Sequence, residues 1–489
     1  MRTVLPKPSI CEEKSGAFSF RDHLYLHVSA DFSMPAFEAR CAEWFANYTC
    51  QKGKLELIRH RETGHTAALS LQKEITLPAQ KTEYEYELQI QPELVTIVYT
   101  EQVGLIHAFV SFLQLLEPYA RKTGTFSVPC VRLADRPALQ MRAMHLAVFP
   151  ETSLTELKKA IRMCGFLKCT HMVLEFWGTL QLDCVKELAW EQAYSKREIA
   201  ELVLDGEAFG MQFIPMCNSL GHAAYSRFRT GKQVLLDQAP EYEELFLESG
   251  WTWDVSKEET RALLSAVRKE LMELFHAPYF HLGCDEAYAA DGRWDGHQIQ
   301  ENRAFVSYLN DLAQDVRAHG RMPIFWGDMF LSNDTFPYPF CGNVSGHCLN
   351  CEENLKQLTP DACLVDWQYN IKEDQPESVE YFLQYRDPKK LLLASWNETD
   401  NIRGRCALAR KYGLLGMIGT TWNRLQSDFS KVIVYTACQM WSEDLHYADL
   451  CGWEVLKTFA ARHLSKLVPC HGNYAEAGFF PQELMPKWE

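Results

Sequence analysis

An alternation of short apolar runs with helix-like segments begins near residue 142 and continues to about residue 422. The apolar runs have the length and composition of strands buried in a parallel sheet. They span residues 144–149, 171–177, 213–217, 279–284, 323–326, 363–369, 391–396 and 416–422. The helix-like segments after Ser153, Ser195 and Ser256 open with Ser-x-x-Glu, the pattern of a capping box. Eight such units predict an α/β fold, a (β/α)8 barrel; a doubly wound open sheet is the alternative, but no glycine-rich phosphate-binding turn follows the first run.

The regions that flank this alternation have a different pattern. An alternating, strand-like run covers residues 84–99 with a turn near Gln91–Pro92, and a helical run follows at 105–115. Strands followed by a helix predict a small N-terminal α+β domain. The expected boundaries are 1–135 for this domain, 136–445 for the catalytic barrel and 446–489 for a C-terminal helical segment packed on the barrel, with a linker over 121–138.

Charge and composition disfavour several classes of function. Lys and Arg number 49 against 64 Asp and Glu, a net charge of −15, which is the wrong sign for binding nucleic acid or an anionic membrane. No apolar stretch reaches the roughly 18–20 residues of a membrane span, and the first residues lack the apolar core of a secretory signal. The 17 cysteines are scattered and odd in number. We therefore expect a cytoplasmic protein with reduced thiols.

One cluster of cysteine and histidine raises the question of a metal site. Cys341, His347, Cys348 and Cys351 lie within eleven residues, and the spacing of the last two cysteines suits zinc. No second paired motif follows them, however, so loop thiols are the favoured interpretation. Neither a metal nor a cofactor is expected.

Two adjacent acids follow the fourth apolar run. The sequence there is His281-Leu-Gly283-Cys-Asp285-Glu286. In a barrel, catalytic residues lie at the C-terminal ends of the strands. Glycoside hydrolysis uses a pair of carboxyl groups, one of which protonates the leaving oxygen. An Asp-Glu pair is usually a solvated surface pair, but its place directly after an apolar strand favours a catalytic site.

Aromatic and polar residues end the other apolar runs in the same way. A single Trp at a strand end usually belongs to the core, but repetition on separate strands predicts a pocket in which aromatic faces stack on a sugar ring. The candidate binding residues are Glu175, His222, His281, Trp326, Asp328, Trp367, Tyr369, Trp396, Asn397 and Trp422.

The segment around the acids resembles the signature of glycoside hydrolase family 20, the β-N-acetylhexosaminidases, as His281-x-Gly283-x-Asp285-Glu286. MRTVLPKPS resembles the opening of that family's N-terminal domain, FIPMCNSLGHA its third strand and PIFWGDM its fifth. The resemblance covers nearly the whole chain and is nearest to the intracellular, hexosaminidase D-like branch. It implies a TIM barrel that removes terminal β-linked GlcNAc or GalNAc from a glycan or glycoconjugate.

The resemblance also implies a mechanism without an enzyme nucleophile. In this family the 2-acetamido oxygen of the substrate attacks the anomeric carbon and forms an oxazolinium. Asp285 would orient the acetamido group, and Glu286 would be the general acid and then the base. Tyr369 would donate to the acetamido oxygen, and His222 and His281 would brace the acids. The tryptophans that would enclose the sugar are Trp326, Trp367, Trp396 and Trp422.

The first strand departs from the family pattern. Ala147 stands where the family has Asp, and Phe149 or Pro150 where it has the Arg that binds the distal hydroxyls. Recognition of O3 and O4 must therefore differ, which leaves the choice between GlcNAc and GalNAc open. The candidate replacements are Glu175, Asp328, Asn397 and Arg424. A non-catalytic sugar-binding barrel and a metal-dependent barrel hydrolase are the alternatives, and a homodimer is the expected assembly if the chain is not a monomer.

Overall fold

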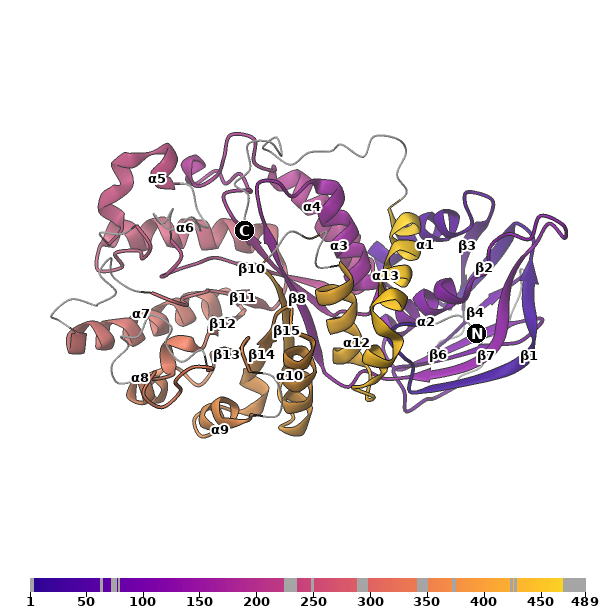
Figure 1. The fold of residues 1–489 in the computed structure, drawn as a ribbon. Coiled ribbons are helices and arrows are strands. Elements are labelled where there is room, and N and C mark those ends of the chain that lie inside the picture. The colour runs from indigo at the N-terminus through magenta and orange to yellow at the C-terminus, as the bar shows by residue number, and fades with distance from the viewer. Residues whose placement is uncertain are drawn as a thin grey trace.

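The fold consists of an N-terminal sheet domain and a barrel (Figure 1). A computed structural model describes residues 4–61, 65–71, 77, 80–223, 235–247, 250–287, 298–340, 351–371, 375–422, 425 and 429–468. Within these residues no helix is both long enough and apolar enough to cross a lipid bilayer.

Among the described residues, the N-terminal domain has a sheet of order β1-β7-β5-β6-β4-β2-β3. Its strands are β1 (Ile10–Phe20), β2 (His23–Ser29), β3 (Lys54–His60), β4 (Thr66–Ser70), β5 (Tyr86–Ile90), β6 (Val95–Tyr99) and β7 (Phe126–Asp135). Neighbouring strands are antiparallel except β2 and β3. Helices α1 (Pro35–Tyr48) and α2 (Gln102–Leu115) lie between this sheet and the helices of the barrel (Figure 1).

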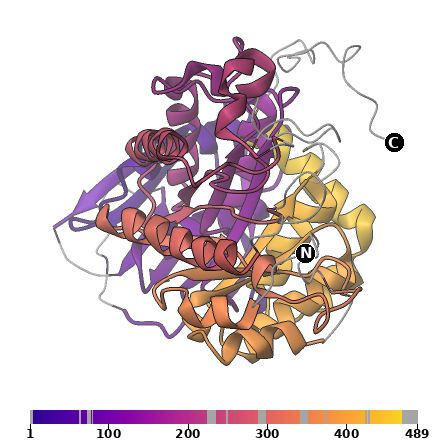
Figure 2. The ribbon, with the colours of Figure 1, turned by 90° about the vertical axis from the view of Figure 1, so that its left-hand side faces the viewer.

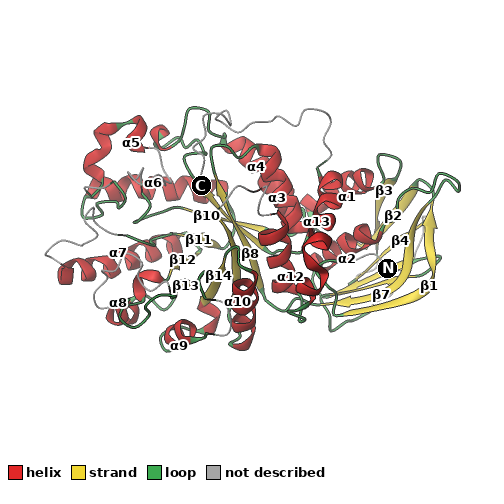
Figure 3. Cartoon of the chain, viewed as in Figure 1, coloured by secondary structure: helices red, strands yellow, loops and turns green. Residues whose placement is uncertain are grey.

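Eight parallel strands of the described chain close into the barrel, in the order β10-β11-β12-β13-β14-β15-β8-β9. They are β8 (Met141–Val148), β9 (His171–Phe176), β10 (Gln212–Met216), β11 (Tyr279–His281), β12 (Met322–Trp326), β13 (Cys363–Trp367), β14 (Leu391–Ser395) and β15 (Gly416–Thr421). Figure 2 views the molecule from the side of the barrel, and Figure 3 distinguishes its helices from its strands.

Helices surround the barrel strands. They are α3 (Leu154–Phe166), α4 (Lys196–Glu207), α5 (Leu235–Gln238), α6 (Glu258–Leu274), α7 (Gln298–Ala318), α8 (Cys351–Gln357), α9 (Glu377–Leu383), α10 (Thr399–Lys411) and α12 (Tyr435–Trp441). A last helix, α13 (Tyr447–Leu467), packs against α1 and α3 and so contacts both parts of the molecule (Figure 1).

The predicted fold class is confirmed, and each of the eight apolar runs contains one barrel strand or most of it. The capping boxes at Ser153 and Ser195 are present. The third is wrong: α6 has Lys257 at its N-cap, and Ser256 lies before the helix, where its backbone N–H and its hydroxyl both donate to the Asp254 carboxylate at 3.2 and 2.5 Å. The predicted linker over 121–138 is also wrong in part, since it contains the sheet strand β7, whose alternating apolar residues pack into the N-terminal core.

Strand alternation decides which side chains point into the barrel. In β8, Met141 and Ala143 belong to the small core inside the barrel, whereas Met144, Leu146 and Val148 pack outward under the helices. The same parity places every second residue of the other strands inside. Near the C-terminal strand ends, these inward positions are no longer filled by aliphatic side chains. They carry the polar and aromatic residues that form the candidate site.

Candidate active site

The loop after β11 carries the two adjacent acids. Three of its residues have a left-handed backbone: Gly283, Cys284 and Glu286 have φ values of 68°, 68° and 44°. A Cβ at Gly283 would lie only 2.7 Å from the Asn218 Oδ1 atom, so both conformation and space require glycine there. Non-glycine residues with positive φ carry backbone strain and concentrate at functional sites. The backbone of this loop at the barrel mouth is therefore held in one specific conformation by its surroundings.

Both acids face one histidine. The Nε2 atom of His222, which follows β10, lies 3.2 Å from Asp285 Oδ2 and 3.1 Å from Glu286 Oε2. The Asp285 side chain is 8% exposed and that of Glu286 is 26% exposed, so Glu286 is the more accessible acid. Trp251 contacts the His222 ring at 4.3 Å and donates its Nε1–H to the Glu286 carbonyl at 2.8 Å. This arrangement places both carboxyl groups at the mouth and fixes the backbone that carries them.

Asp328 lies behind the acids, directly after β12. Its Oδ2 atom accepts the Glu286 backbone N–H at 3.0 Å, and its Oδ1 atom accepts the Trp367 Nε1–H at 3.2 Å. Burial, and after it the negative charge of Asp285, raises the pKa of Asp328 to about 8. The sequence predicted that Asp328 binds substrate. In the structure its two oxygens hold the loop of the two acids and the Trp367 side chain, and the predicted substrate-binding role stays a prediction.

The predicted aromatic residues lie together. Trp326 is buried, with its ring 4.6 Å from His281 and 6.4 Å from Trp422. The Trp422 Nε1–H donates to the Tyr369 hydroxyl at 3.1 Å. The Tyr369 ring in turn lies 5.2 Å from Trp367 and 5.9 Å from Trp396. These rings, at the ends of β12, β13, β14 and β15, form a continuous aromatic wall at the mouth, and Asn397, half-buried, follows the last ring of β14.

The carboxylate of Glu175 contacts protein groups as well. Its Oε2 atom lies 3.0 Å from His145 Nε2, and its Oε1 atom accepts from Asn218 Nδ2 at 2.6 Å. His145, Asn218 and Trp251 were not among the predicted site residues. Strand parity could have found His145, which is an inward position of the first apolar run two residues before Ala147. Trp251 carried no signal, because it lies in a long loop far from any strand end.

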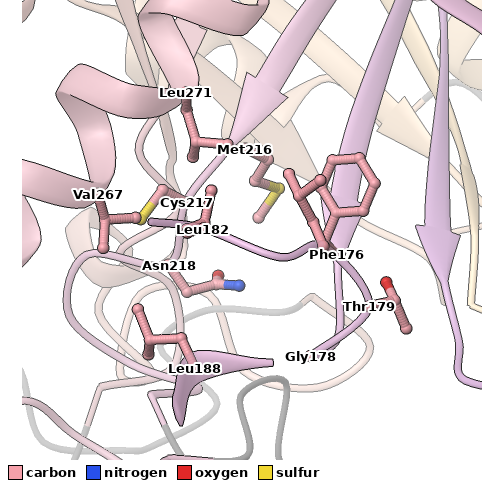
Figure 4. A pocket seen from close by; sticks show the side chains of 11 residues that line it. Phe176, Gly178, Thr179, Leu182, Leu188, Met216, Cys217, Asn218, Val267 and Leu271 are labelled. Atoms are coloured by element: carbon pink, nitrogen blue, oxygen red, sulfur yellow. The ribbon is translucent and has the colours of Figure 1, made fainter. Parts of the chain in front are cut away.

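A mostly apolar pocket lies beside this polar group, between α6 and the loop after β9 (Figure 4). Its lining residues are Phe176, Gly178, Thr179, Leu180, Leu182, Leu188, Met216, Cys217, Asn218, Val267 and Leu271. Figure 4 shows the Asn218 amide among these aliphatic and sulfur-containing side chains. None of the lining residues is acidic.

Most of the cysteine and histidine cluster considered as a metal site lies outside the described residues. Cys341, His347 and Cys348 belong to that part of the chain, as does Arg424. Cys351 is buried at the first position of α8. In the part of the chain that the structure describes, no three His, Cys, Asp or Glu side chains lie close enough together to hold a metal ion.

Comparison with known proteins assigns this architecture to a family. The sequence pattern of "Glycosyl hydrolase family 20, domain 2" matches residues 1–136, and that of "Glycosyl hydrolase family 20, catalytic domain" matches residues 170–381. A lacto-N-biosidase of Bifidobacterium bifidum is 22% identical over 53% of this chain and 24% of its own length. Hexosaminidase D of Bos taurus is 28% identical over 28% of this chain and 40% of its own length.

Solved structures share the fold at low sequence identity. A β-N-acetylhexosaminidase from Bacteroides fragilis superposes with a TM-score of 0.66 and 16% identity, covering 94% of this chain and 95% of that one. An exo-β-N-acetylglucosaminidase from Vibrio harveyi in complex with N-acetylglucosamine gives 0.68 and 15% identity, covering 95% and 77%. The chain matches only a quarter to about half of the length of the first curated relatives. Because the two family patterns together span most of its residues, the chain belongs to glycosyl hydrolase family 20.

Proposed function

We propose that this protein is an exo-acting, retaining β-N-acetylhexosaminidase that removes terminal β-linked GlcNAc or GalNAc from glycans. The observation that carries the proposal is the arrangement of Asp285 and Glu286. They are adjacent on one strained loop, share the Nε2 atom of His222 and are joined to the aromatic wall through Asp328. A sugar ring stacked on that wall would present its anomeric carbon to the acids.

In the proposed reaction the substrate supplies the nucleophile. A retaining enzyme with its own nucleophile needs two carboxyl groups about 5–5.5 Å apart that flank the anomeric carbon. Asp285 and Glu286 leave the same loop and contact the same imidazole nitrogen, so they approach the sugar from one side. Asp285 is therefore suited to hold the 2-acetamido group and to balance the positive charge that develops on its nitrogen.

The bond changes then follow in two steps. The acetamido oxygen bonds to the anomeric carbon while the glycosidic bond breaks, and Glu286 gives its proton to the departing oxygen. Water then attacks the anomeric carbon, Glu286 removes a proton from that water, and the oxazolinium ring opens. Attack by a group held on the same sugar is intramolecular, which can lower the activation barrier by about 7–11 kcal/mol.

The proposal is tested with aryl β-GlcNAc, β-GalNAc and β-glucoside substrates assayed in parallel. We expect hydrolysis of at least one of the first two and almost none of the glucoside, which lacks the acetamido group. Asp285→Asn should reduce the rate severely, since the charge on the acetamido nitrogen would be unbalanced. Trapping with a fluorinated sugar, followed by intact-mass analysis, decides the mechanism: a stable adduct on either acid would exclude it.

The distal edge of the sugar faces an unusual surface. Phe149, just after β8, packs its ring edge-on against Trp177 at 4.6 Å, and Ala147 before it is buried. These two side chains have no polar atoms with which to hydrogen-bond O3 or O4. The ratio of the hydrolysis rates of the β-GlcNAc and β-GalNAc substrates therefore measures how strongly the other residues of the site discriminate between the two configurations at O4.

We also infer that the protein works in the cytoplasm and belongs with the hexosaminidase D-like members of the family. Free cysteines in the described chain, many of them buried, support a reducing compartment. Cell fractionation with a compartment marker tests this inference. The homodimer expected from the sequence stays a prediction, and light scattering of the purified protein would decide it.

A further inference from the structure

Three buried polar side chains form a continuous chain across the barrel, from β8 through β9 to the segment after β10. The His145 Nε2 atom lies 3.0 Å from one oxygen of Glu175, and the Asn218 amide donates to the other oxygen at 2.6 Å. All three side chains are at most 3% exposed. His145 and Glu175 occupy inward positions of the neighbouring strands β8 and β9, and Asn218 follows the last inward residue of β10, Met216, by two residues.

The Asn218 end of this chain touches the catalytic loop. A Cβ on Gly283 would meet the Asn218 Oδ1 atom at 2.7 Å and its Cα at 3.1 Å, so the two backbones pack in close contact. The Asn218 carbonyl also accepts the Trp253 Nε1–H at 3.1 Å, which fixes its peptide. Since Gly283 precedes Asp285 by two residues, the orientation of the Asn218 amide bears directly on where the acid lies.

The His145 end touches the aromatic wall. Its ring lies 4.4 Å from Trp422 and 6.5 Å from Trp326. Trp422 is in turn hydrogen-bonded to the Tyr369 hydroxyl at 3.1 Å, so a shift of the Trp422 ring would also move its contact with Tyr369. The orientation of the His145 ring therefore bears on the surface against which we propose the sugar stacks.

Glu175 joins the two ends because it accepts from both. The Asn218 Nδ2 atom is a donor, and an ionised carboxylate only accepts, so the His145 ring must carry a proton on Nε2. An amide in place of the carboxylate has one oxygen for two donors. Replacing the carboxylate with an amide of the same shape and volume therefore breaks one of the two contacts, unless the amide donates to His145 and the ring moves its proton from Nε2 to Nδ1.

We propose that Glu175 is a positioning residue of the reaction, which through Asn218 places the loop of Asp285 and Glu286 and through His145 places the Trp422 wall. This inference rests on the proposed function. It replaces the substrate-binding role that the sequence predicted for Glu175. The Asn218 branch acts on the acids and should affect kcat, whereas the His145 branch acts on the wall and should affect KM.

A pair of complementary substitutions tests the proposal. Glu175→Gln leaves two donors competing for one oxygen, and Asn218→Asp places two carboxylates in contact. Each alone should lower kcat/KM by about 100-fold, the scale of a misplacement of about 1 Å in a catalytic site. In the double variant, the new amide at position 175 donates to the new carboxylate at position 218 and still accepts from His145. It should recover to within about tenfold of the wild type, with the loss in Asn218→Asp mainly in kcat.

Asp205→Asn is the matched control. Asp205 is equally buried and pairs with Arg162 at 2.6 Å between the outer helices α3 and α4. It should lower the melting temperature without changing kcat/KM of the folded enzyme. The proposal is overturned if Glu175→Gln stays within threefold of wild-type kcat/KM while its melting temperature falls, as in the control, or if the double variant is no better than the worse single one.

A second measurement separates this inference from the proposed function. Nitrogen NMR of labelled histidine, assigned with His145→Gln, reports which ring nitrogen carries the proton. We expect a protonated Nε2 in the wild type and in the double variant, and a changed signal in Glu175→Gln. Should the wild type hydrolyse none of the three glycosides, the proposed function fails while this readout still decides on Glu175: an unchanged signal in Glu175→Gln overturns the inference.

Discussion

Two buried polar clusters lie at opposite ends of the same barrel. The junction cluster lies at the N-terminal strand ends, where the N-terminal domain meets the barrel, and consists of Glu85, Tyr86, His107, Asp135, Arg142, Lys168 and Trp441. The mouth cluster lies at the C-terminal strand ends and consists of Glu175, His222, Asp285, Glu286 and Asp328. Both are built largely from residues at or near strand ends, but their charges are arranged in opposite ways.

In the junction cluster both acids face cationic or donor groups, and the Arg142 guanidinium donates to backbone carbonyl groups. One oxygen of Asp135 accepts from Lys168 at 3.0 Å and from Tyr86 at 2.9 Å, and the other accepts from Trp441 at 2.9 Å. Burial alone would raise the pKa of Glu85, but His107, with Arg142 and Lys168 behind it, outweighs burial and lowers the pKa to about 2. Such matching stabilises the contact between the two domains.

In the mouth cluster, acids outnumber the described cations. Asp285 and Glu286 contact one imidazole, Asp328 accepts the Glu286 backbone N–H behind them, and burial followed by the charge of Asp285 raises the pKa of Asp328 to about 8. Holding like charges together is unfavourable for folding, and groups with strongly perturbed pKa values concentrate at functional sites. The comparison teaches that burial alone does not mark a site, whereas unmatched charge does.

Glu286→Gln should give the largest effect, and only on activity. Removing the general acid should lower kcat/KM by about 10²–10⁴-fold for a substrate with a poor leaving group. The loss should shrink for a very good leaving group, which needs little protonation. A series of aryl glycosides of graded leaving-group pKa checks this, and an equal loss across the series would reassign the acid.

Asp135→Asn should give the complementary result at the junction. It leaves the buried ammonium of Lys168 without its carboxylate, a change that typically destabilises by about 3–5 kcal/mol. We expect a large drop in melting temperature with an unchanged kcat per folded molecule. Glu443→Gln is the control, because its pair with Arg136 is exposed at 55% and 61% and should contribute at most about 1 kcal/mol. Equal shifts of the melting temperature in the two variants would show that the buried pair of Asp135 and Lys168 contributes no more to stability than an exposed ion pair.

The two clusters should respond to pH with opposite signs. The pKa of Asp328 in the folded protein, about 8, lies above its ordinary value of 3.8, so its contribution to stability is present below about pH 3.8 and is lost as pH rises toward 8. The pKa of Glu85 is lowered from 4.5 to about 2, so its contribution is present above about pH 4.5 and is lost on acidification toward pH 2.

Melting temperatures as a function of pH test these signs. Relative to Asp328→Asn, the wild type should lose on the order of 5 kcal/mol of stability between about pH 4 and 8, since the shift is about four pKa units and each unit corresponds to about 1.4 kcal/mol. Relative to Glu85→Gln, it should lose stability only as the pH falls below about 4.5. The hydrogen bonds lost in each variant add an offset that does not depend on pH, so the slope is the quantity that decides. Parallel curves for wild type and variant would contradict the assignment.

Sequence reasoning was most successful where a periodic pattern had one physical cause. The barrel strands were predictable because both faces of each strand are buried, which leaves an apolar run of limited length. The aromatic wall was predictable because strand parity brings every second residue of a barrel to the same mouth, and the acids were found because they directly follow an apolar run. The protein contacts of Glu175 and Asp328 were not predictable, since residue type does not reveal whether a carboxylate meets the protein's own donors. Their predicted substrate-binding role stays a prediction.

Contacts between segments distant in sequence were also not predictable. The linker prediction over 121–138 missed β7 because its partners, β1 and β5, lie far away in the chain. Trp251 holds the Glu286 carbonyl from a loop without any periodic pattern. The capping box at Ser256 is absent because the Asp254 carboxylate, two residues earlier, accepts from both the backbone N–H and the hydroxyl of Ser256, and the helix begins later, at Glu258.

The smallest expected effect is that of removing metal ions. The same experiment is the most direct test of the contrast between the junction cluster and the mouth cluster. The junction cluster balances its acids with Lys168 and Arg142, and a divalent cation could in principle play that part at the mouth. The proposed mechanism has no such need, because the acetamido nitrogen becomes positive during the reaction and Asp285 faces that charge. A chelator, and separately Cys351→Ser, should therefore leave kcat/KM within about twofold of the untreated wild type. Elemental analysis of the same samples is the control. Loss of stoichiometric zinc together with the activity would show that a bound cation balances the acids at the mouth. The proposal that Asp285 faces the positive acetamido nitrogen would then have to be replaced.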